Sequence, residues 1–121
     1  ENSNRNMLTH QELVSNLVKP GEQIAREITP IQAHMTHMVI GISGEAGELL
    51  DAVKKHVIYR KELDVANVIE DIGDLQFYIE GLCQAIGHSP GFCMAANINK
   101  LQKRYSNGYS DQAAIERADK K

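Results

Sequence analysis

The spacing of apolar residues in the middle of the chain is the feature that most constrains the fold. Thr29 followed by Pro30 is a strong helix start, because threonine can cap a helix and proline suits its first position. From there to about Tyr59, apolar residues recur at helical spacing: Ile31, Met35, Met38, Ile42, Leu49 and Val53. No stretch alternates with a period of two, and the 3 prolines lie at positions 20, 30 and 90. This pattern predicts an all-α fold.

Capping signals predict where the other helices begin and end. Thr9 can cap a first helix, with Glu12 reaching back to complete a capping box. Asp64 is expected to cap a second long helix and Gly87 to close it. The predicted helices span 9–18, 22–28, 30–59, 64–86, 90–105 and a short segment after 110. We expect one domain over residues 9–121, with residues 1–8 as a disordered terminus or a cloning remnant.

The composition excludes several classes of protein. A chain of 121 residues is long enough to form a core without disulfide or metal staples. No apolar run approaches the roughly 18 residues of a membrane span, so a membrane partner is not expected. A net charge of -3, with 4 Tyr, 2 Phe and no Trp, argues against a nucleic-acid partner. Cys83 and Cys93 make no disulfide framework, which favours a reducing, cytoplasmic compartment.

The predicted helix over residues 30–59 is long for a chain of this size. It would extend about 45 Å, whereas a globule of this length is about 35 Å across. We therefore expect the helix either to kink or to extend into a partner, and the second case favours a homo-oligomer. Gly41, Gly44 and Gly47 form a bare ridge along it, which a kink and a close approach of another backbone would both explain.

Acidic residues concentrate between positions 45 and 80. This segment carries nine acidic and four basic residues, a charge of -5, so the remainder of the chain is net basic by +2. On a helical wheel, Glu45 and Glu48 lie about 70° and 130° to one side of their apolar stripe. The helix expected over 64–86 has its own apolar stripe, formed by Val68, Ile72, Leu75, Ile79, Leu82 and Ile86. Asp71 and Asp74 lie about 60° and 120° to the same side of that stripe. Antiparallel packing of the two stripes would bring the four carboxylates to one seam.

Four carboxylates at one seam require a cation, because like charges repel. Lys54 and Lys55 lie two or more turns beyond Glu45, too far to neutralise all four. An all-oxygen ligand set suits a hard divalent ion, Mg²⁺ or Mn²⁺. The alternative is a solvated acidic face on two amphipathic helices, and the coincidence of two matched pairs favours the ion. The sequence has no Glu-x-x-His pair, the signature of helical di-iron sites, so His34 is interpreted as a pocket-lining or hydrogen-bonded residue.

A basic row on the predicted helix 90–105 complements these acids. Asn97, Lys100 and Arg104 fall on one helix face, and an amide with two cations suits phosphate oxygens. Taken alone, the row would be a solvated basic helix end, favoured by the helix dipole. Beside the carboxylates, it indicates an anionic substrate held between a metal ion and cationic side chains.

Three ordered segments closely resemble the MazG-like nucleotide pyrophosphohydrolases. They read GEAGELLDAVKK at 44–55, IEDIGDL at 69–75 and NINKLQKRY at 97–105, with GYS at 108–110, and the resemblance covers about residues 30–112. It implies a four-helix core with short extra helices, assembled as a homodimer or homotetramer. The implied activity is Mg²⁺-dependent hydrolysis of nucleoside triphosphates to monophosphates and pyrophosphate, for nucleotide-pool control or house-cleaning. Dimeric dUTPases and phosphoribosyl-ATP pyrophosphatases are relatives of the same build.

The resemblance also implies the metal ligands. Glu45 and Glu48 match the family's first pair of acids, and Asp71 and Asp74 match its second pair. The family usually has a glutamate where Asp71 stands, which leaves open whether Asp71 or Glu70 reaches the metal. On the wheel, Glu70 points about 160° from the apolar stripe, which favours Asp71.

The implied reaction assigns roles to the remaining residues. Water would attack the α-phosphorus in line, and Glu45 or Glu48 would be the base that orients it. Substrate would be bound by Lys54, Asn97, Lys100 and Arg104 at the phosphates and by His34 and Tyr78 at the base or sugar. Two alternatives stay open: a substrate restricted to dUTP or phosphoribosyl-ATP, and a non-enzymatic α-helical interaction module.

Overall fold

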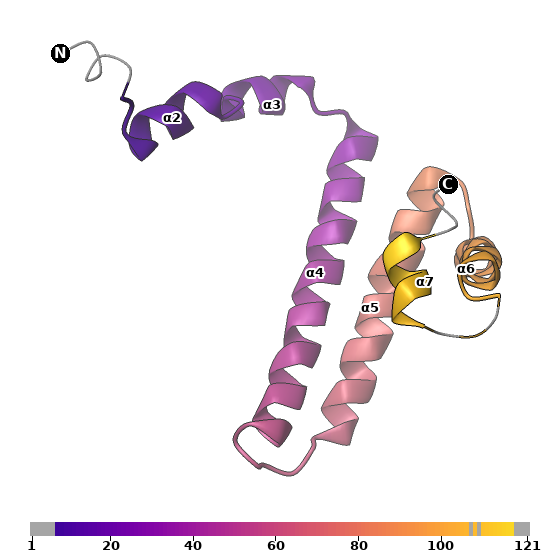
Figure 1. Cartoon of the computed structure of the whole chain (residues 1–121). Coiled ribbons are helices and arrows are strands. Elements are labelled where there is room, and N and C mark those ends of the chain that lie inside the picture. Colours follow the sequence, from indigo (N-terminus) through magenta and orange to yellow (C-terminus); the bar gives the residue numbers. More distant parts are fainter. Residues whose placement is uncertain (1–6, 107, 109, 118–121) are drawn as a thin grey trace. The chain divides into compact units, whose positions relative to one another are not determined.

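The computed structural model describes residues 7–106, 108 and 110–117, and these residues form helices and turns without a β-strand (Figure 1). The expected all-α class is therefore confirmed. The expected disorder of residues 1–8 concerns mainly residues 1–6, which lie outside the described residues. The helices are α2 (His10–Leu17), α3 (Gly21–Glu27), α4 (Pro30–Val57), α5 (Val65–Ile86), α6 (Pro90–Arg104) and α7 (Asp111–Glu116).

The helix ends follow the predicted capping residues. Thr9 and Glu12 form the capping box, with backbone-to-side-chain hydrogen bonds of 2.9 and 3.1 Å. The Asp64 carboxylate accepts a hydrogen bond from the Asn67 amide at 3.0 Å, and Gly87 ends α5 in the left-handed region at φ 76°. Ser89 and Ser110 cap α6 and α7 in the same way as Asp64 caps α5. These ends were predictable because capping involves only residues within one turn.

The chain divides into two compact units, residues 1–32 and 33–121. In the first unit, α2 and α3 have no buried residue. An ion pair of 2.7 Å joins Lys19 Nζ to Glu27 Oε1, and Gln23 donates a hydrogen bond to the same glutamate at 2.8 Å. In the second unit, the candidate site lies on α4 and α5.

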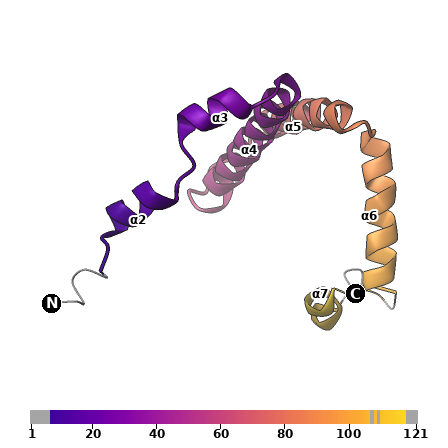
Figure 2. The ribbon, with the colours of Figure 1, turned by 90° about the horizontal axis from the view of Figure 1, so that it is seen from above.

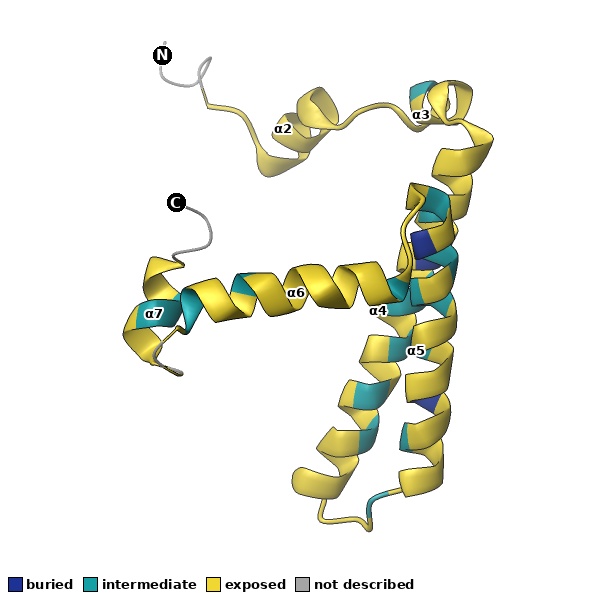
Figure 3. Ribbon diagram, turned by 90° about the vertical axis from the view of Figure 1, so that its right-hand side faces the viewer, coloured by how far each residue is buried: buried dark blue, intermediate teal, exposed yellow. Residues whose placement is uncertain are grey.

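Helices α4 and α5 lie side by side and run antiparallel (Figures 1 and 3). Gly41 on α4 meets the ring of Tyr78, and Gly81 on α5 meets the thioether of Met38, so closely that a Cβ at either glycine would overlap its neighbour. Residue numbers rise along α4 as those of the facing residues fall along α5. The absence of a side chain at Gly41 and at Gly81 therefore determines how closely the two helices approach each other.

The glycine ridge on α4 serves close packing at one of its three positions. The helix runs without interruption from Pro30 to Val57 through all three glycines. A Cβ would overlap Tyr78 at Gly41, whereas it would meet no atom within 4 Å at Gly44 or Gly47. The close-packing interpretation is thus confirmed for Gly41, and Gly81 is a second such position that the sequence reading missed.

The core between α4 and α5 is narrow (Figure 3). Among the described residues, only Met38, Asp71 and Cys83 are buried, with exposed fractions of 6%, 3% and 5%. Most of the predicted stripe is half-buried: Met35, Ile42, Leu49, Val68, Leu75, Ile79 and Leu82. Its other members, Ile31, Val53, Ile72 and Ile86, are exposed, so the prediction was wrong for these four in the single chain. Two helices touch along a line only, which leaves the flanks of both stripes open.

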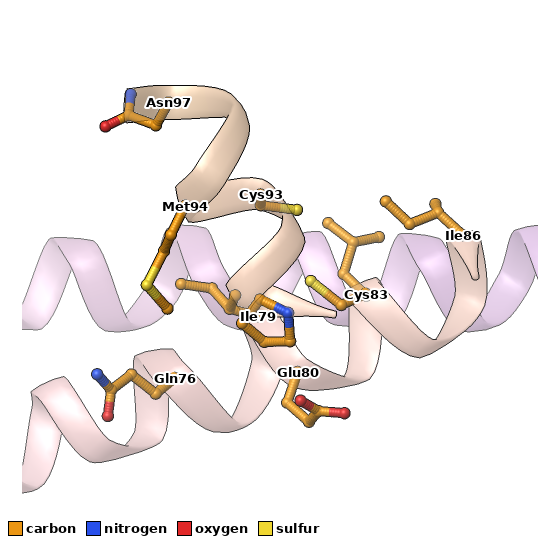
Figure 4. A pocket seen from close by; sticks show the side chains of 10 residues that line it. Gln76, Ile79, Glu80, Cys83, Ile86, Cys93, Met94 and Asn97 are labelled. Carbon is orange, nitrogen blue, oxygen red and sulfur yellow. The ribbon is translucent and has the colours of Figure 1, made fainter. Parts of the chain in front are cut away.

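Helix α6 crosses α5 steeply instead of packing alongside it (Figures 2 and 3). The crossing leaves a groove of about 710 Å³ between the two helices. Its lining is mainly apolar and includes Ile79, Leu82, Ile86 and Met94 (Figure 4). No helix in the described part of the chain combines the length and the apolar character needed to cross a membrane.

Candidate functional site

Three carboxylates from α4 and α5 converge where the two helices face each other. Glu45, Asp71 and Asp74 each place one carboxylate oxygen within 4.8 Å of the other two, and we call these three residues the acidic cluster. Asp71 is buried, Glu45 is half-buried and Asp74 is exposed. The antiparallel packing of the stripes thus brings together three of the four acids that were expected at one seam.

Glu48, the fourth acid, adjoins the acidic cluster. Its side chain shares a hydrogen bond with Glu45, and its charge raises the pKa of both Glu45 and Asp71. A hydrogen bond between two carboxyl groups requires a proton on one of them. Without a cation, ionisation of all four acids would therefore cost free energy.

The protein environment disfavours the ionised form of two members of the cluster. Burial is the largest cause that raises the pKa of Glu45 above 4.5, followed by the charges of Glu48, Asp74 and Asp71. Burial likewise raises the pKa of Asp71 above 3.8, followed by Glu48, Asp74 and Asp64. Desolvation and like charges act in the same direction at both groups.

One oxygen of the acidic cluster has no partner among the described residues. Glu45 Oε2 is buried and makes no hydrogen bond there. The nearby lysines interact elsewhere: Lys55 Nζ pairs with Asp51 Oδ2 at 2.9 Å, and Lys54 Nζ lies 5.7 Å from the centroid of the Tyr59 ring. A buried acceptor among like charges fits a bound cation, and an all-carboxylate donor set fits Mg²⁺ or Mn²⁺.

Asn67 holds one of the carboxylates and was missed by the sequence reading. Its Nδ2 donates a hydrogen bond of 3.3 Å to Asp71 Oδ2. The available signal was its position four residues before Asp71, which places both side chains on one helix face. Glu70, the alternative ligand, is exposed and does not belong to the acidic cluster.

A polar hollow of about 360 Å³ opens beside the acidic cluster. Glu48 and Asn67 line it, and both interact with members of the cluster. Gly44 and Gly47 lie on its wall, where the absence of side chains leaves backbone accessible. The hollow therefore offers room for a small polar group next to the carboxylates.

The four residues predicted to bind phosphate have different neighbours in the single chain. Lys54 lies over Tyr59, and the Arg104 guanidinium lies 5.9 Å from the centroid of the Tyr105 ring. Asn97 lines the groove between α5 and α6 (Figure 4), and Lys100 is half-buried on α6. Their assignment to phosphate stays a prediction.

The two candidates for the base or sugar pocket pack α4 against α5. His34 Nε2 donates a hydrogen bond of 3.2 Å to the carbonyl oxygen of Gly81, which fits its interpretation as a hydrogen-bonded polar residue. The Tyr78 ring lies against Gly41 and makes an edge-to-face contact with His37, with centroids 6.1 Å apart. Both residues thus have a structural role, and their role in binding a base or sugar stays a prediction.

Comparisons of the chain with models of protein families, with curated proteins and with solved structures found no match. The resemblance to the MazG-like pyrophosphohydrolases therefore stays a prediction that rests on the motifs themselves.

Proposed function

We propose that the chain is a Mg²⁺-dependent nucleoside triphosphate pyrophosphohydrolase of the MazG-like type, acting in nucleotide-pool control or house-cleaning. The observation that carries the proposal is the buried, unpartnered Glu45 oxygen among converging carboxylates. Buried acceptors normally have hydrogen-bond donors, whereas Glu45 Oε2 has none among the described residues, and the acids around it raise the pKa of Glu45 and Asp71. The order and spacing of the three sequence motifs supply the reaction type.

Glu45, Glu48, Asp71 and Asp74 would hold the divalent ion, with Mn²⁺ able to replace Mg²⁺. Asn67 would orient Asp71 by binding Oδ2 and leaving the other oxygen for the metal. When bound, the ion would neutralise phosphate charge and lower the pKa of a bound water.

The protein's own side chains would then provide the base and the phosphate contacts. Glu45 or Glu48, whichever is less committed to the metal, would accept the proton of the attacking water. The water oxygen bonds to the α-phosphorus as the bond to the pyrophosphate oxygen breaks. The side chains proposed to neutralise and bind the phosphates are Lys54, Asn97, Lys100 and Arg104.

A homodimer or homotetramer forms part of the proposal. Large apolar side chains are exposed along both long helices, including Ile40, Leu50, Ile69 and Phe77. Such a surface is costly in water and is typical of an interface. At 28 residues, α4 extends about 42 Å, which offers a long contact surface to a second copy. We place the protein in the cytoplasm, because neither of its two cysteines forms a disulfide in the described structure.

Pyrophosphate release from a panel of nucleotides tests the activity. The full chain is incubated with Mg²⁺ and each NTP and dNTP, including dUTP, and with phosphoribosyl-ATP. We expect release from at least one substrate, and a rate at least about a hundredfold lower in Glu48→Ala. Glu70→Ala, an exposed acid outside the cluster, is the matched control and should retain activity. No release from any substrate would refute the proposal.

The second candidate is a non-enzymatic helical interaction module, favoured by the exposed apolar faces. Thermal melts separate the two candidates. A metal-organised site gains stability from Mg²⁺ or Mn²⁺ with nucleotide, because ligands that bind the folded state shift unfolding to higher temperature. A scaffold with solvated acids would melt at the same temperature in the presence of metal, nucleotide or both.

A further inference from the structure

The groove between α5 and α6 holds both cysteines of the chain. Cys83 lies near the end of α5 and is buried, whereas Cys93 lies in the first turn of α6 and is exposed. Both line the groove, and Figure 4 shows their side chains reaching into it from the two helices. Both thiols are free. In the sequence, two cysteines ten positions apart make no disulfide framework, so their shared groove is a finding of the structure.

The turn between the two helices brings the cysteines together. Gly87 takes the left-handed conformation, at φ 76°, that reverses the chain after α5. The His88 amide then donates a hydrogen bond of 3.1 Å to the Cys83 carbonyl, and the Cys93 amide donates one of 3.2 Å to the Ser89 carbonyl. The backbone at each cysteine is thus fixed by the turn.

An aromatic stack braces the same turn. The rings of His88 and Phe92 lie 4.3 Å apart at 21°, and Phe92 precedes Cys93 directly. Burial raises the pKa of the Cys83 thiol, and a hydrogen bond with the Cys93 side chain raises it further. The two thiols therefore line the same groove from neighbouring helix ends, and the backbone of each helix end is held by hydrogen bonds.

We infer that Cys83 and Cys93 form a reversible intramolecular disulfide that ties the start of α6 to the end of α5. The oxidant is a small-molecule disulfide such as oxidised glutathione. The exposed Cys93 thiolate attacks it, forming a mixed disulfide and releasing one glutathione thiolate. Cys83, as its thiolate, then attacks the Cys93 sulfur and releases the second glutathione. Two protein thiols and one glutathione disulfide thus become one protein disulfide and two glutathione thiols.

The inference does not depend on the proposed hydrolase activity. A disulfide here would fix the angle between α5 and α6 and close part of the groove that both cysteines line. It would also raise the free energy of unfolding, because it restricts the conformations of the unfolded chain.

Oxidation of the full chain with excess oxidised glutathione tests this inference. Intact mass is measured without reductant, and free thiols are counted before and after addition of dithiothreitol. We expect a monomer that is lighter by two hydrogen atoms, without a glutathione adduct, with no free thiol and with a higher Tm than the reduced protein. Dithiothreitol should restore both thiols.

Two single variants distinguish the order of the steps. Cys83→Ser should stop at a mixed disulfide on Cys93, because the resolving thiol is missing. Cys93→Ser should remain unmodified, because Cys83 is buried. Because Cys83→Ser alters a buried residue, Cys93→Ser keeps the test valid if the former fails to fold. A lasting glutathione adduct on the wild-type chain, a covalent dimer, or modification of Cys93→Ser at the wild-type rate would overturn the inference.

Discussion

At the residue scale, the central feature is a group of acids that is unfavourable without a cation. The raised pKa values of Glu45 and Asp71 mean that the folded state binds their protons more tightly than the unfolded state does. Below their ordinary values of 4.5 and 3.8, both groups are protonated in both states and contribute nothing to stability. As the pH rises from these ordinary values toward the higher folded-state pKa values, the unfolded state loses its protons first, so the free energy of unfolding falls. These two groups therefore destabilise the metal-free protein at neutral pH, where the full cost is present.

Neutral variants of these two groups should stabilise the metal-free protein at pH 7. Glu45→Gln and Asp71→Asn remove the cost of ionisation, so their free energy of unfolding should exceed that of the wild type at pH 7 in EDTA. The advantage should shrink as the pH falls below the ordinary values of 4.5 and 3.8, where the wild-type groups are protonated in both states. Urea denaturation across this pH range measures it, with Glu70→Gln as the exposed control. Equal pH profiles for wild type and variants would contradict the account.

Asn67 should act on metal affinity through Asp71. Removing the hydrogen bond that orients a ligand typically lowers metal affinity, and we expect about a tenfold loss of Mg²⁺ affinity in Asn67→Ala. Gln84→Ala is a matched control, because Gln84 also donates to an acid one turn away on α5, Glu80, at 2.8 Å. Isothermal titration with Mg²⁺ compares the variants. A loss of equal size in both variants would mean that Asn67 acts only through helix stability.

The helical wheel predicted which acids approach one another, since Asp71 and Glu45 depend only on helical period and the antiparallel pairing of two stripes. The wheel angles also agree with their burial, since Asp71, which is nearer the apolar stripe, is buried while Asp74 is exposed. How far each acid is buried also depends on the surface of α4 that faces it, which one helical wheel does not describe. Asn67 was missed because its position four residues before Asp71 shows only that the two side chains share a helix face, and not that they form a hydrogen bond.

At the element scale, capping residues define where the helices begin and end. The absence of a side chain at Gly41 and at Gly81 allows α4 and α5 to pack closely. Thr9, Asp64 and Ser89 cap their helices, because each side chain accepts a hydrogen bond from a backbone amide three residues later in the sequence. Such short-range interactions can be predicted from the sequence. The closest approaches, at Gly41 and Gly81, depend on which residue of the partner helix lies opposite. The steep crossing of α6 depends on the turn at Gly87 and was not predictable from helical period.

Alanine at two glycines of α4 should have opposite effects on stability. In Gly41→Ala, the new Cβ overlaps the Tyr78 ring, and overpacking of this kind costs about 1–3 kcal/mol. In Gly44→Ala, the Cβ meets nothing within 4 Å, so the better helix propensity of alanine should stabilise the protein by up to about 1 kcal/mol. Urea denaturation measures both. A destabilised Gly44→Ala, or an unchanged Gly41→Ala, would show that α4 and α5 pack in another register.

At the scale of the whole molecule, one chain leaves much apolar surface uncovered. Ile40 on α4 and Ile69 on α5 have exposed fractions of 63% and 65%. The excess length of the helix from residue 30 pointed to a partner, but which face is covered cannot be predicted from one chain, because it depends on the surface of the other copy.

A charge on this surface should separate the copies without unfolding the chain. Sedimentation velocity should show a dimer or tetramer for the wild type and a smaller species for Ile40→Lys and Ile69→Lys. Circular dichroism should show similar helix content in all of them. Gln84→Lys, a change at an exposed polar position, is the control and should retain the wild-type assembly. A monomeric wild type would contradict the proposed assembly.

The most direct test of the central claim is a Mn²⁺ titration of the full chain, followed by electron paramagnetic resonance of the free ion. The account predicts saturable binding to the wild type and to Glu70→Gln. It predicts loss of that binding in Glu45→Gln and in Asp71→Asn, and recovery of the free Mn²⁺ signal from the wild type on addition of excess Mg²⁺. Weak binding of equal strength to all four proteins would show that the acidic cluster holds no divalent ion.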